Sequence, residues 1–239
     1  MLELGCGSGQ DTATLSRAGL HVIAIDRSSE SIATARAVTF GVEYHCQDMR
    51  APFPASAAAL GVVVASLSLH YFAWSETVAL VERIHDVLRV GGILLCRLNS
   101  TEDHHHGASG HPAIETNYYL VEGEPKRFFD RASIDRLFAK GWRVIDIGLH
   151  VVDRYARPKA LWEVILEKTV RLAILVALLV GTGIIAGHEA SAQSPALLLE
   201  ARCEVWDAAR RCVLWGPSLV ELITPPRSTT AGESGSSAG

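Results

Sequence analysis

A glycine-rich segment lies close to the amino terminus, between a short apolar run and a stretch with helical periodicity. Residues 5–9 read GCGSG. Glycines at a strand-to-helix turn permit left-handed backbone and let the main chain approach a ligand closely. A dinucleotide fingerprint would need one more glycine where Gln10 stands, and no Lys-Ser or Lys-Thr pair follows to complete a P-loop. The spacing therefore predicts a ligand-binding turn and disfavours NAD and FAD.

Carboxylates follow the next two apolar runs. Asp26 closes the run 21–26, where a carboxylate can accept hydrogen bonds from both hydroxyls of a ribose. Asp48 and Met49 follow the run 42–47 and supply an acid and an apolar side chain. Either acid taken alone is better explained as a solvated strand end. Placed together at consecutive strand ends, the acids predict a ligand site at one edge of a parallel sheet.

Candidate catalytic side chains follow the fourth and fifth apolar runs. His70 and Tyr71 come after the run 60–67, and a histidine with a near-neutral reference pKa could act there as a base. A packing role for the histidine is equally open. Arg97 ends the fifth run and, with the basic pair 126–127, could face an anionic acceptor or simply be solvated.

A long loop with four histidines follows the fifth run. Residues 99–112 read NSTEDHHHGASGHP, with His105 between two further histidines. Long loops at strand ends often carry binding function. Three interpretations stay open: a solvated loop, recognition of or proton transfer with an acceptor, and a metal site. The metal site is least favoured because adjacent loop histidines lack helical i, i+4 spacing, and no metal ligands are predicted.

Strand-length apolar runs alternate with segments of helical periodicity up to residue 168. This alternation predicts an α/β fold with a doubly wound, Rossmann-like, mostly parallel sheet of about seven strands. Ser28 and Ser75 are expected to cap helices, and Gly19, Gly41, Gly91-Gly92 and Gly141 to end them. The predicted strands are 1–4, 21–26, 42–47, 60–67, 92–98, 142–152 and 161–167, and the predicted helices are 10–18, 29–38, 75–88 and 130–140.

Five motifs in this order resemble those of class I S-adenosylmethionine-dependent methyltransferases: ELGCGSG (3–9), Asp26, Asp48, SLSLHYF (66–72) and VLRVGG (87–92). The resemblance implies S-adenosyl-L-methionine as cofactor. Its methionine end would lie at the glycine segment, its ribose at Asp26 and its adenine at Asp48. Carboxylates suit this cofactor because it is cationic and carries no phosphate. The predicted cofactor-binding residues are Glu3, Gly5, Cys6, Gly7, Gly9, Asp26, Arg27, Asp48, Met49 and Ser66, and the predicted catalytic residues are His70, Tyr71, Arg97 and His105.

The resemblance also bears on the acceptor. The chain lacks the (Asp/Asn)-Pro-Pro-aromatic segment that the family uses on nucleobases and protein amides, which favours a small-molecule acceptor. Similarity to the tellurite-resistance and thiopurine-type enzymes implies a small, soft or anionic acceptor, methylated at S, Se, Te, O or N. The family's helix before the first strand is missing, which implies a shortened amino-terminal side. Two alternatives stay open: a cofactor-binding protein without turnover and, less favoured, an NAD-dependent oxidoreductase.

Charge and cysteine usage limit the partners and the compartment. With 22 Lys+Arg against 26 Asp+Glu, the net charge of -4 gives no general attraction to nucleic acid. The 5 cysteines are scattered and form no CxxC pair, which favours free thiols in a reducing compartment. The sequence therefore predicts a cytoplasmic catalytic domain that binds a small molecule and no nucleic acid, and it assigns no oligomeric state.

The composition changes near residue 168. The segment 172–187 carries no charge, and three interpretations of it stay open: a membrane tether, a helix packed on the domain, or a fused reading frame. The predicted organisation is a methyltransferase domain at 1–168, a hydrophobic helix at 169–193, a helical tail of unassigned role at 194–224 and a disordered end at 225–239.

Overall fold

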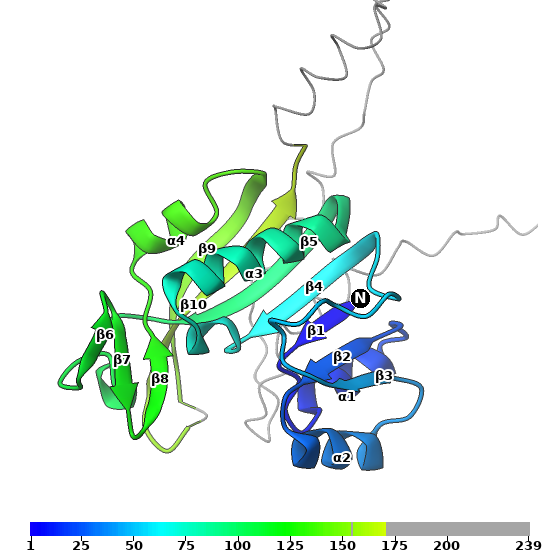
Figure 1. The fold of residues 1–239 in the computed structure, drawn as a ribbon, viewed down its shortest axis with the longest axis horizontal. Coiled ribbons are helices and arrows are strands. Elements are labelled where there is room, and N and C mark those ends of the chain that lie inside the picture. The colour runs from blue at the N-terminus through cyan, green and yellow to red at the C-terminus, as the bar shows by residue number, and fades with distance from the viewer. Residues whose placement is uncertain (154, 171–239) are drawn as a thin grey trace, which may run out of the picture.

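The computed structural model describes residues 1–153 and 155–170. Its main feature is a seven-stranded sheet in the order β3-β2-β1-β4-β5-β10-β9 (Figure 1). The pairs from β3 to β5 are parallel, and β10 runs antiparallel to both its neighbours. This confirms the predicted doubly wound, Rossmann-like sheet. Its strands are β1 (Leu2–Leu4), β2 (Ile23–Asp26), β3 (Glu43–Cys46), β4 (Leu60–Ser66), β5 (Leu88–Asn99), β9 (Trp142–Val152) and β10 (Lys159–Lys168).

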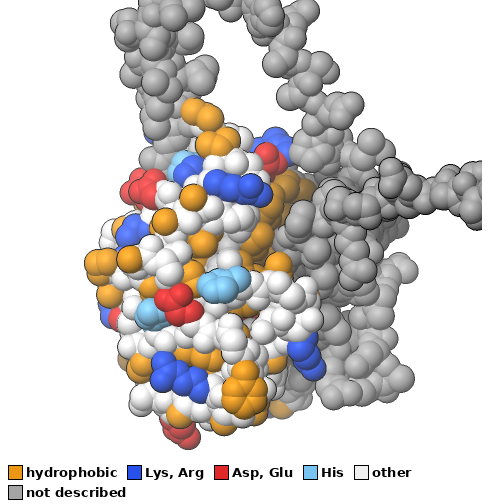
Figure 2. Space-filling model, turned by 90° about the vertical axis from the view of Figure 1, so that its right-hand side faces the viewer, with side chains coloured by type: hydrophobic (Ala, Val, Ile, Leu, Met, Phe, Trp, Pro, Cys, Tyr) orange, Lys and Arg blue, Asp and Glu red, His pale blue; other side chains and the backbone are white. Residues whose placement is uncertain are grey.

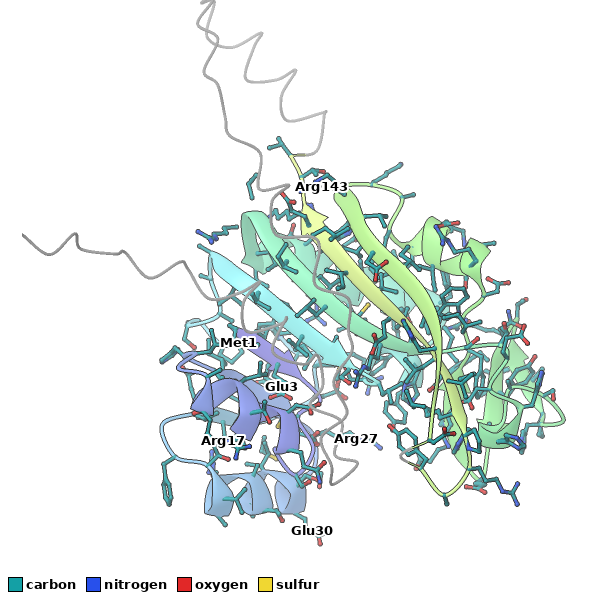
Figure 3. The ribbon with its side chains drawn as sticks, turned by 180° about the vertical axis from the view of Figure 1, so that it is seen from behind. Met1, Glu3, Arg17, Arg27, Glu30 and Arg143 are labelled. Carbon is teal, nitrogen blue, oxygen red and sulfur yellow. The ribbon has the colours of Figure 1, made fainter. Side chains whose placement is uncertain are left out.

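Helices cover both faces of this sheet (Figures 1 and 3). Leu80 and Ile84 of α3 are buried with strand residues in one apolar core, and Leu15 of α1 and Ile32 of α2 are buried in a second core on the other face. Each such side chain contributes about 1.5–3 kcal/mol when it is fully buried. The two cores fix the sheet between its helix layers. Because β1 to β5 run parallel, their carboxyl ends lie at the same edge of the sheet. The helices are α1 (Gln10–Arg17), α2 (Ser29–Val38), α3 (Trp74–Val87) and α4 (Arg131–Leu137).

The helix boundaries confirm some predicted caps and correct others. Ser28 caps α2, with its hydroxyl accepting from the Ser31 amide at 3.1 Å. Ser75, however, lies inside α3, which starts at Trp74. The start of α3 is satisfied by Glu76, whose carboxylate accepts from the backbone N–H of Ala73 at 3.1 Å. Glu76 thus supplies the half of a capping box that satisfies the N-cap amide, and the next amide, of Trp74, donates to Glu115 at 3.0 Å.

The predicted end of α3 at Gly91-Gly92 is wrong. The helix ends at Val87, and β5 begins at Leu88, which pairs with Leu60 of β4. Val62, two residues after Leu60, pairs with Ile93, which is five residues after Leu88. The segment 89–92 therefore bulges out of the strand. A Cβ at Gly92 would lie 2.8 Å from the Arg89 carbonyl oxygen. These glycines therefore serve a strand bulge, where backbone approaches backbone.

A second sheet forms at residues 113–127, after the predicted histidine loop, where the sequence analysis predicted no strand. Its strands lie in the order β6-β7-β8, joined by antiparallel pairing, and it stands beside the end of β4 (Figure 1). Short strands separated by turn residues give little period-2 signal, which explains the omission. The added elements are β6 (Ala113–Glu115), β7 (Tyr118–Val121), β8 (Glu124–Arg127) and the 3₁₀ turns η1 (Leu69–Tyr71) and η2 (His104–His106).

The end of β10 at Lys168 coincides with the predicted domain boundary. The predicted hydrophobic segment 172–187, the tail 194–224 and the end 225–239 lie outside the described residues. Within residues 1–153 and 155–170, no helix has the length and apolar character needed to cross a membrane.

One side of the molecule carries charges of both signs. Figure 2 shows acidic, basic and histidine side chains interspersed on it with scattered hydrophobic ones. This mixture gives the face no single-sign field, as the small net charge of -4 leads one to expect.

Candidate functional site

The glycine segment forms the turn between β1 and α1. Gly5, Gly7 and Gly9 all have left-handed φ angles, of 75°, 52° and 84°. A Cβ at Gly5 would lie 2.6 Å from the Ser68 Cβ, and one at Gly9 would lie 2.7 Å from the Ala35 Cβ. A Cβ at Gly7 would meet no atom within 4 Å. The first and third glycines thus allow close packing, while the middle one leaves open space beside the backbone.

Asp26 holds this turn from the end of β2. Its Oδ2 accepts from the Gly7 amide at 2.8 Å, and its Oδ1 accepts from the Ser28 amide at 2.8 Å. The backbone adds a second tie, because the Ile25 carbonyl accepts from the Gly5 and Cys6 amides. Each carboxylate oxygen has two acceptor lone pairs. Asp26 can therefore anchor the turn and still accept from a ligand.

Glu3 and Cys6 lie under the turn. Glu3 is 3% exposed, and its carboxyl accepts from the hydroxyl of Thr12 on α1; its position is labelled in Figure 3. Burial raises the pKa of Glu3 to about 8 and that of the Cys6 thiol to about 12. Both side chains are consequently uncharged near pH 7. Their burial favours a role in supporting the turn over the direct ligand contact predicted from the sequence.

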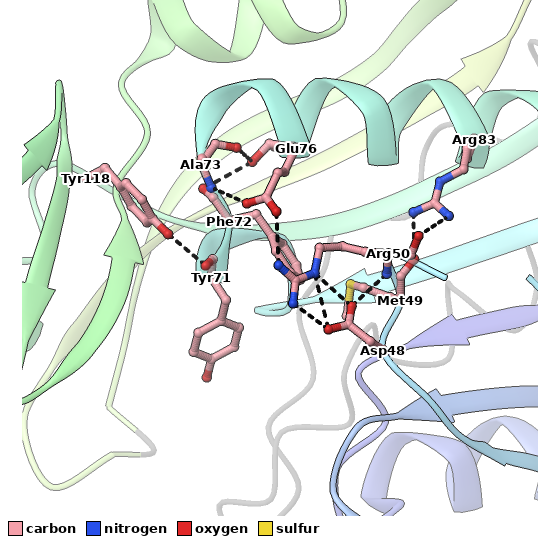
Figure 4. Close-up of polar contacts among 10 residues, drawn as sticks. Asp48, Met49, Arg50, Tyr71, Phe72, Ala73, Glu76, Arg83 and Tyr118 are labelled. Carbon is pink, nitrogen blue, oxygen red and sulfur yellow. Dashed lines mark hydrogen bonds and ion pairs between the residues drawn. The ribbon is translucent and has the colours of Figure 1, made fainter. Parts of the chain in front are cut away.

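Asp48, at the third strand end, is part of an ion-pair network. Its Oδ2 accepts from Arg50 Nη2 at 2.7 Å, and Arg50 Nη1 reaches Glu76 Oε1 at 3.0 Å (Figure 4). The Arg50 guanidinium is the main cause of the lowered pKa of Asp48. Asp48, which the family resemblance assigns to the adenine, thus already has a cationic partner, and its contact with adenine stays a prediction. The network joins the segment after β3 to α3.

Arg83 on α3 holds the same segment from the other side. Its guanidinium donates to the carbonyls of Met49, Arg50 and Ala51 at 2.7, 2.8 and 2.7 Å (Figure 4). A Cβ at Gly5 would lie 3.6 Å from Met49 Cε, so the methionine side chain faces the glycine turn; the contact of Met49 with adenine stays a prediction. Neither arginine was predicted: Arg50 pairs with Asp48 two residues away, and the carbonyls that accept from Arg83 lie 32 to 34 residues before it in the chain.

Arg27 lies next to Asp26 at the end of β2 (Figure 3). Its guanidinium is 3.9 Å from the carboxylate of Glu124 on β8, and both side chains are more than half exposed. Exposed pairs at this distance contribute little to stability. The contact nevertheless shows that the small sheet and the end of β2 approach each other across the strand ends.

The segment after β4 is held by the small sheet. The Tyr118 hydroxyl donates to the Tyr71 carbonyl at 2.9 Å, and Arg127 Nε donates to the Phe72 carbonyl at 3.1 Å. Arg127 is 3% exposed and also pairs with Glu115, so the predicted surface charge at this position is instead a buried anchor. The small sheet thus positions η1 and the candidate residues His70 and Tyr71.

His70 and Tyr71 are oriented differently within η1. His70 is 5% exposed, and burial, reinforced by the charges of Lys159 and Lys126, lowers its pKa to about 3. Tyr71 is 43% exposed, and its ring centroid is 4.1 Å from that of His70. A histidine with this pKa is neutral near pH 7 and a weak base. Its position favours hydrogen bonding over the predicted proton abstraction.

Arg97 and Ser66 do not occupy the predicted positions. Arg97 is 3% exposed and pairs with Glu163 of β10, with Nη2 and Oε1 2.7 Å apart. It therefore does not present a free cation to an anionic acceptor. Ser66 lies within β4, paired in register with Arg97. The serine that faces the glycine turn is Ser68, two residues later.

The histidine loop contributes a buried ion pair. His105 is exposed on η2, while Asp103, just before it, is 1% exposed and accepts from Lys159 Nζ at 2.8 Å. This pair fixes the loop to β10. Within the described ranges, no group of three or more His, Cys, Asp or Glu side chains is arranged to hold a metal ion.

A hollow lies away from these strand ends, beside Trp74 at the start of α3. The guanidinium of Arg136 lies 4.2 Å from the Trp74 ring centroid, and that of Arg127 lies 5.6 Å from it. These stacked side chains join α3, α4 and β8. Of the candidates from the sequence only Arg127 lines the hollow, and we assign its lining a structural role.

Comparison with known proteins matches this arrangement. Residues 1–92 match a family described as a methyltransferase domain. Over 93 residues the chain is 27% identical to an uncharacterized methyltransferase of Synechocystis sp., a match that covers 39% of this chain and 43% of that relative. The chain thus spans less than half the length of this curated relative.

Solved structures extend the similarity to the whole sheet. An S-adenosylmethionine-dependent methyltransferase from Methanosarcina mazei aligns with a TM-score of 0.61 and 17% identity, covering 71% of this chain and 92% of that one. The 1,6-didemethyltoxoflavin-N1-methyltransferase of Burkholderia thailandensis aligns with a TM-score of 0.55 and 20% identity, covering 71% and 70%. The described residues therefore have the class I methyltransferase fold, and residues 1–92 carry the methyltransferase-domain sequence pattern.

Proposed function

We propose that this domain binds S-adenosyl-L-methionine at the ends of β1, β2 and β3 and transfers its methyl group to a small-molecule acceptor. The observation that carries the proposal is the joint placement of Gly7 and Asp26. The glycine leaves open space beside the backbone, and each oxygen of the carboxylate that holds it accepts one backbone hydrogen bond and can accept another.

The residues at this edge suit the cofactor chemically. S-adenosylmethionine supplies an activated methyl group on a cationic sulfonium. Asp26 would accept from the ribose hydroxyls, and the Met49 side chain would pack against the adenine or the sulfur end. The amide of Gly7 already donates to Asp26, so the turn is preorganised and needs little rearrangement to receive a ligand.

The protein's task in methyl transfer is to align the acceptor and exclude water. η1 and the small sheet stand at the ends of β4 and β5, next to the glycine turn. In this proposal Tyr71, whose side chain is half exposed, covers the acceptor, and His70 orients it through a hydrogen bond. The exposed His105 is assigned to the outer rim of the same side.

Two of the similar structures are named for small-molecule acceptors, which supports a small-molecule acceptor here. One of them acts on 1,6-didemethyltoxoflavin, and another is a magnesium protoporphyrin IX methyltransferase of Synechocystis, with a TM-score of 0.51. The tellurite-resistance and thiopurine-type subgroup stays a prediction from the sequence. A cytoplasmic location belongs to the same proposal.

Calorimetric titration tests the cofactor assignment. S-adenosylmethionine and S-adenosylhomocysteine should bind, and NAD should not. Asp26→Ala should weaken cofactor binding by about 1–3 kcal/mol through lost charge-assisted hydrogen bonds. Asp135→Ala removes an equal charge from the exposed surface of α4 and should leave the affinity unchanged. Binding of NAD alone would end the methyltransferase proposal.

A further inference from the structure

A series of polar contacts leads from the end of β3 to the end of η1 (Figure 4). The Arg50 guanidinium donates to both oxygens of Asp48, at 3.0 Å from Nε and 2.7 Å from Nη2. Its Nη1 donates to Glu76 Oε1 at 3.0 Å, and the other oxygen of Glu76 accepts from the Ala73 amide at 3.1 Å. Ala73 directly follows Phe72, the residue after η1. Every step of the series is therefore a hydrogen bond of ordinary length.

Arg50 also contacts the residue after η1 directly. Its guanidinium carbon lies 5.4 Å from the centroid of the Phe72 ring, within the range of a cation–π contact. Phe72 is 8% exposed and belongs to the apolar core under α3. The guanidinium thus reaches the end of η1 by two routes, one through Glu76 and one through this ring.

The side chain of Arg50 is not needed to hold its own segment. Arg83 of α3 already fixes the backbone of residues 49–51 through hydrogen bonds to three carbonyls (Figure 4). One of these carbonyls is that of Arg50 itself. Arg83 therefore accounts for the position of the segment, and the Arg50 side chain adds a connection to the start of α3.

The contacts of Arg50 are partly open to solvent. The side chains of Arg50, Asp48 and Glu76 are 50%, 36% and 39% exposed. Water screens exposed ion pairs, so they contribute little to stability. A ligand that covers them excludes this water, and the same charges then attract each other more strongly. The network can thus respond to a ligand bound at the end of β3.

The small sheet holds η1 from its other side. Tyr118 and Arg127 donate to the carbonyls of Tyr71 and Phe72. The exposed side chain of Tyr71 consequently belongs to a turn with anchors on two sides. The anchor made by Arg50 is the one that connects this turn to the end of β3.

We propose that Arg50 is a positioning residue that couples cofactor binding to the position of η1. A cofactor seated against residues 48–49 would strengthen the contacts of Arg50. Through Glu76 and Phe72 these contacts would then fix η1 and its exposed Tyr71. The inference rests on the proposed function and adds an order of events, because the acceptor side is completed only once the cofactor has bound.

Amide hydrogen exchange of the whole chain tests the coupling at Ala73. Its amide donates to Glu76, so its exchange rate measures how often this contact opens. Saturating S-adenosylhomocysteine should slow this exchange by about fivefold or more, the lower end of common couplings between sites. In Arg50→Met and in Glu76→Gln, saturating ligand should produce no slowing. A residue that only stabilises the fold would change the rate with and without ligand and leave their ratio intact.

Ligand affinity gives a second test that leaves Arg50 and Asp48 in place. A coupling between two sites acts equally in both directions. Glu76→Gln keeps an oxygen for the Ala73 amide but loses the charge that pairs with Arg50. It should therefore weaken S-adenosylhomocysteine binding in calorimetry by about the same fivefold. Glu82→Gln removes an exposed acid later in α3 and is the matched control, with unchanged affinity.

The outcomes distinguish this inference from the proposed function. Unchanged exchange at Ala73 while S-adenosylhomocysteine binds the wild type overturns the coupling and leaves the cofactor assignment standing. Equal slowing in the wild type and in Glu76→Gln also overturns it, as does an equal affinity of Glu76→Gln and Glu82→Gln. Failure of S-adenosylhomocysteine to bind the wild type overturns the proposed function, and the coupling with it.

Discussion

Two halves of one sheet edge are held together in different ways. The cofactor half, where we propose that S-adenosylmethionine binds, lies at the ends of β1 to β3 and is a turn of left-handed glycines tied by backbone amides to Asp26. The acceptor half, where we propose that the acceptor binds, lies at the ends of β4 and β5 and depends on side chains far apart in the chain. Lys159 pairs with Asp103, and Arg127 donates to the Phe72 carbonyl from 55 residues away.

This difference determines how each half tolerates change. A backbone turn tolerates substitutions that keep its φ angles and is broken by a Cβ placed in the wrong direction. A set of buried side-chain pairs fails when one member is removed, because the other is left uncompensated. Variants that disrupt one half at a time should therefore lose stability or affinity in different ways.

The largest effect is expected from breaking the Asp103–Lys159 pair in the acceptor half. Asp103→Leu leaves a buried ammonium without its counter-ion and should destabilise the fold by about 3–5 kcal/mol. Urea unfolding measures the loss. The double variant Asp103→Leu, Lys159→Met should recover most of it, since replacing both members by apolar groups is often neutral. If the double variant is no more stable than the single one, the pair is not the cause.

In the cofactor half, Gly5→Ala and Gly7→Ala should differ. Both place a side chain at a left-handed φ, a strain of about 1–3 kcal/mol. Gly5→Ala adds a Cβ 2.6 Å from the Ser68 Cβ and should therefore lose more stability in urea unfolding. Gly7→Ala meets open space in the ligand-free chain, so its main loss should be in cofactor affinity by calorimetry. Equal stability losses would contradict the close packing inferred at Gly5.

Arg83→Met tests the hydrogen bonds by which Arg83 on α3 holds the segment 49–51 of the cofactor half. Loss of its hydrogen bonds to the carbonyls of residues 49–51 should cost about 2 kcal/mol in urea unfolding. Cofactor affinity should fall as the segment loosens. Arg89→Met removes an exposed arginine from the β5 bulge and serves as control. If Arg83→Met loses no more stability than Arg89→Met, the hydrogen bonds of Arg83 do not stabilise the fold.

Changes of stability with pH test both halves together, and the two halves should give opposite signs. The folded pKa of Glu3 is raised from 4.5 to about 8, so its contribution is present below pH 4.5 and is lost as the pH rises toward 8. The folded pKa of His70 is lowered from 6.5 to about 3. Its contribution is present above pH 6.5 and is lost as the pH falls toward 3.

Urea unfolding across pH measures both contributions as differences between wild type and variant. Glu3→Gln should gain stability relative to wild type between pH 4.5 and 8, and His70→Phe should gain relative to wild type between pH 6.5 and 3. Asp135→Asn, on the exposed surface of α4, controls for loss of a surface acid. Slopes of the same sign in the two variants would contradict the burial assigned to one of these groups.

Much of the cofactor half could be predicted from the sequence. The left-handed glycines and Asp26 at the end of β2 depend on local spacing and strand order. That Met49 faces the turn was not predicted, because Arg83 holds its segment from 34 residues away. The acceptor half could not be predicted in the same way. Arg97 looked like a free cation because its partner Glu163 lies on a strand added 66 residues later, and Ser68 was passed over for Ser66.

The sequence alone determined the order of strands and helices, because apolar periodicity and turn residues act over short distances. It therefore determined the seven-stranded sheet, though not the small sheet β6-β7-β8, and the edge at which we propose that a ligand binds. Only the tertiary structure decided which polar side chains at that edge are already paired and which are not. Arg50, Arg97 and Asp103 have partners, and Ser68, His70 and Asn99 have none among the described residues. That distinction depends on burial and long-range pairing, which become defined only when distant strands meet.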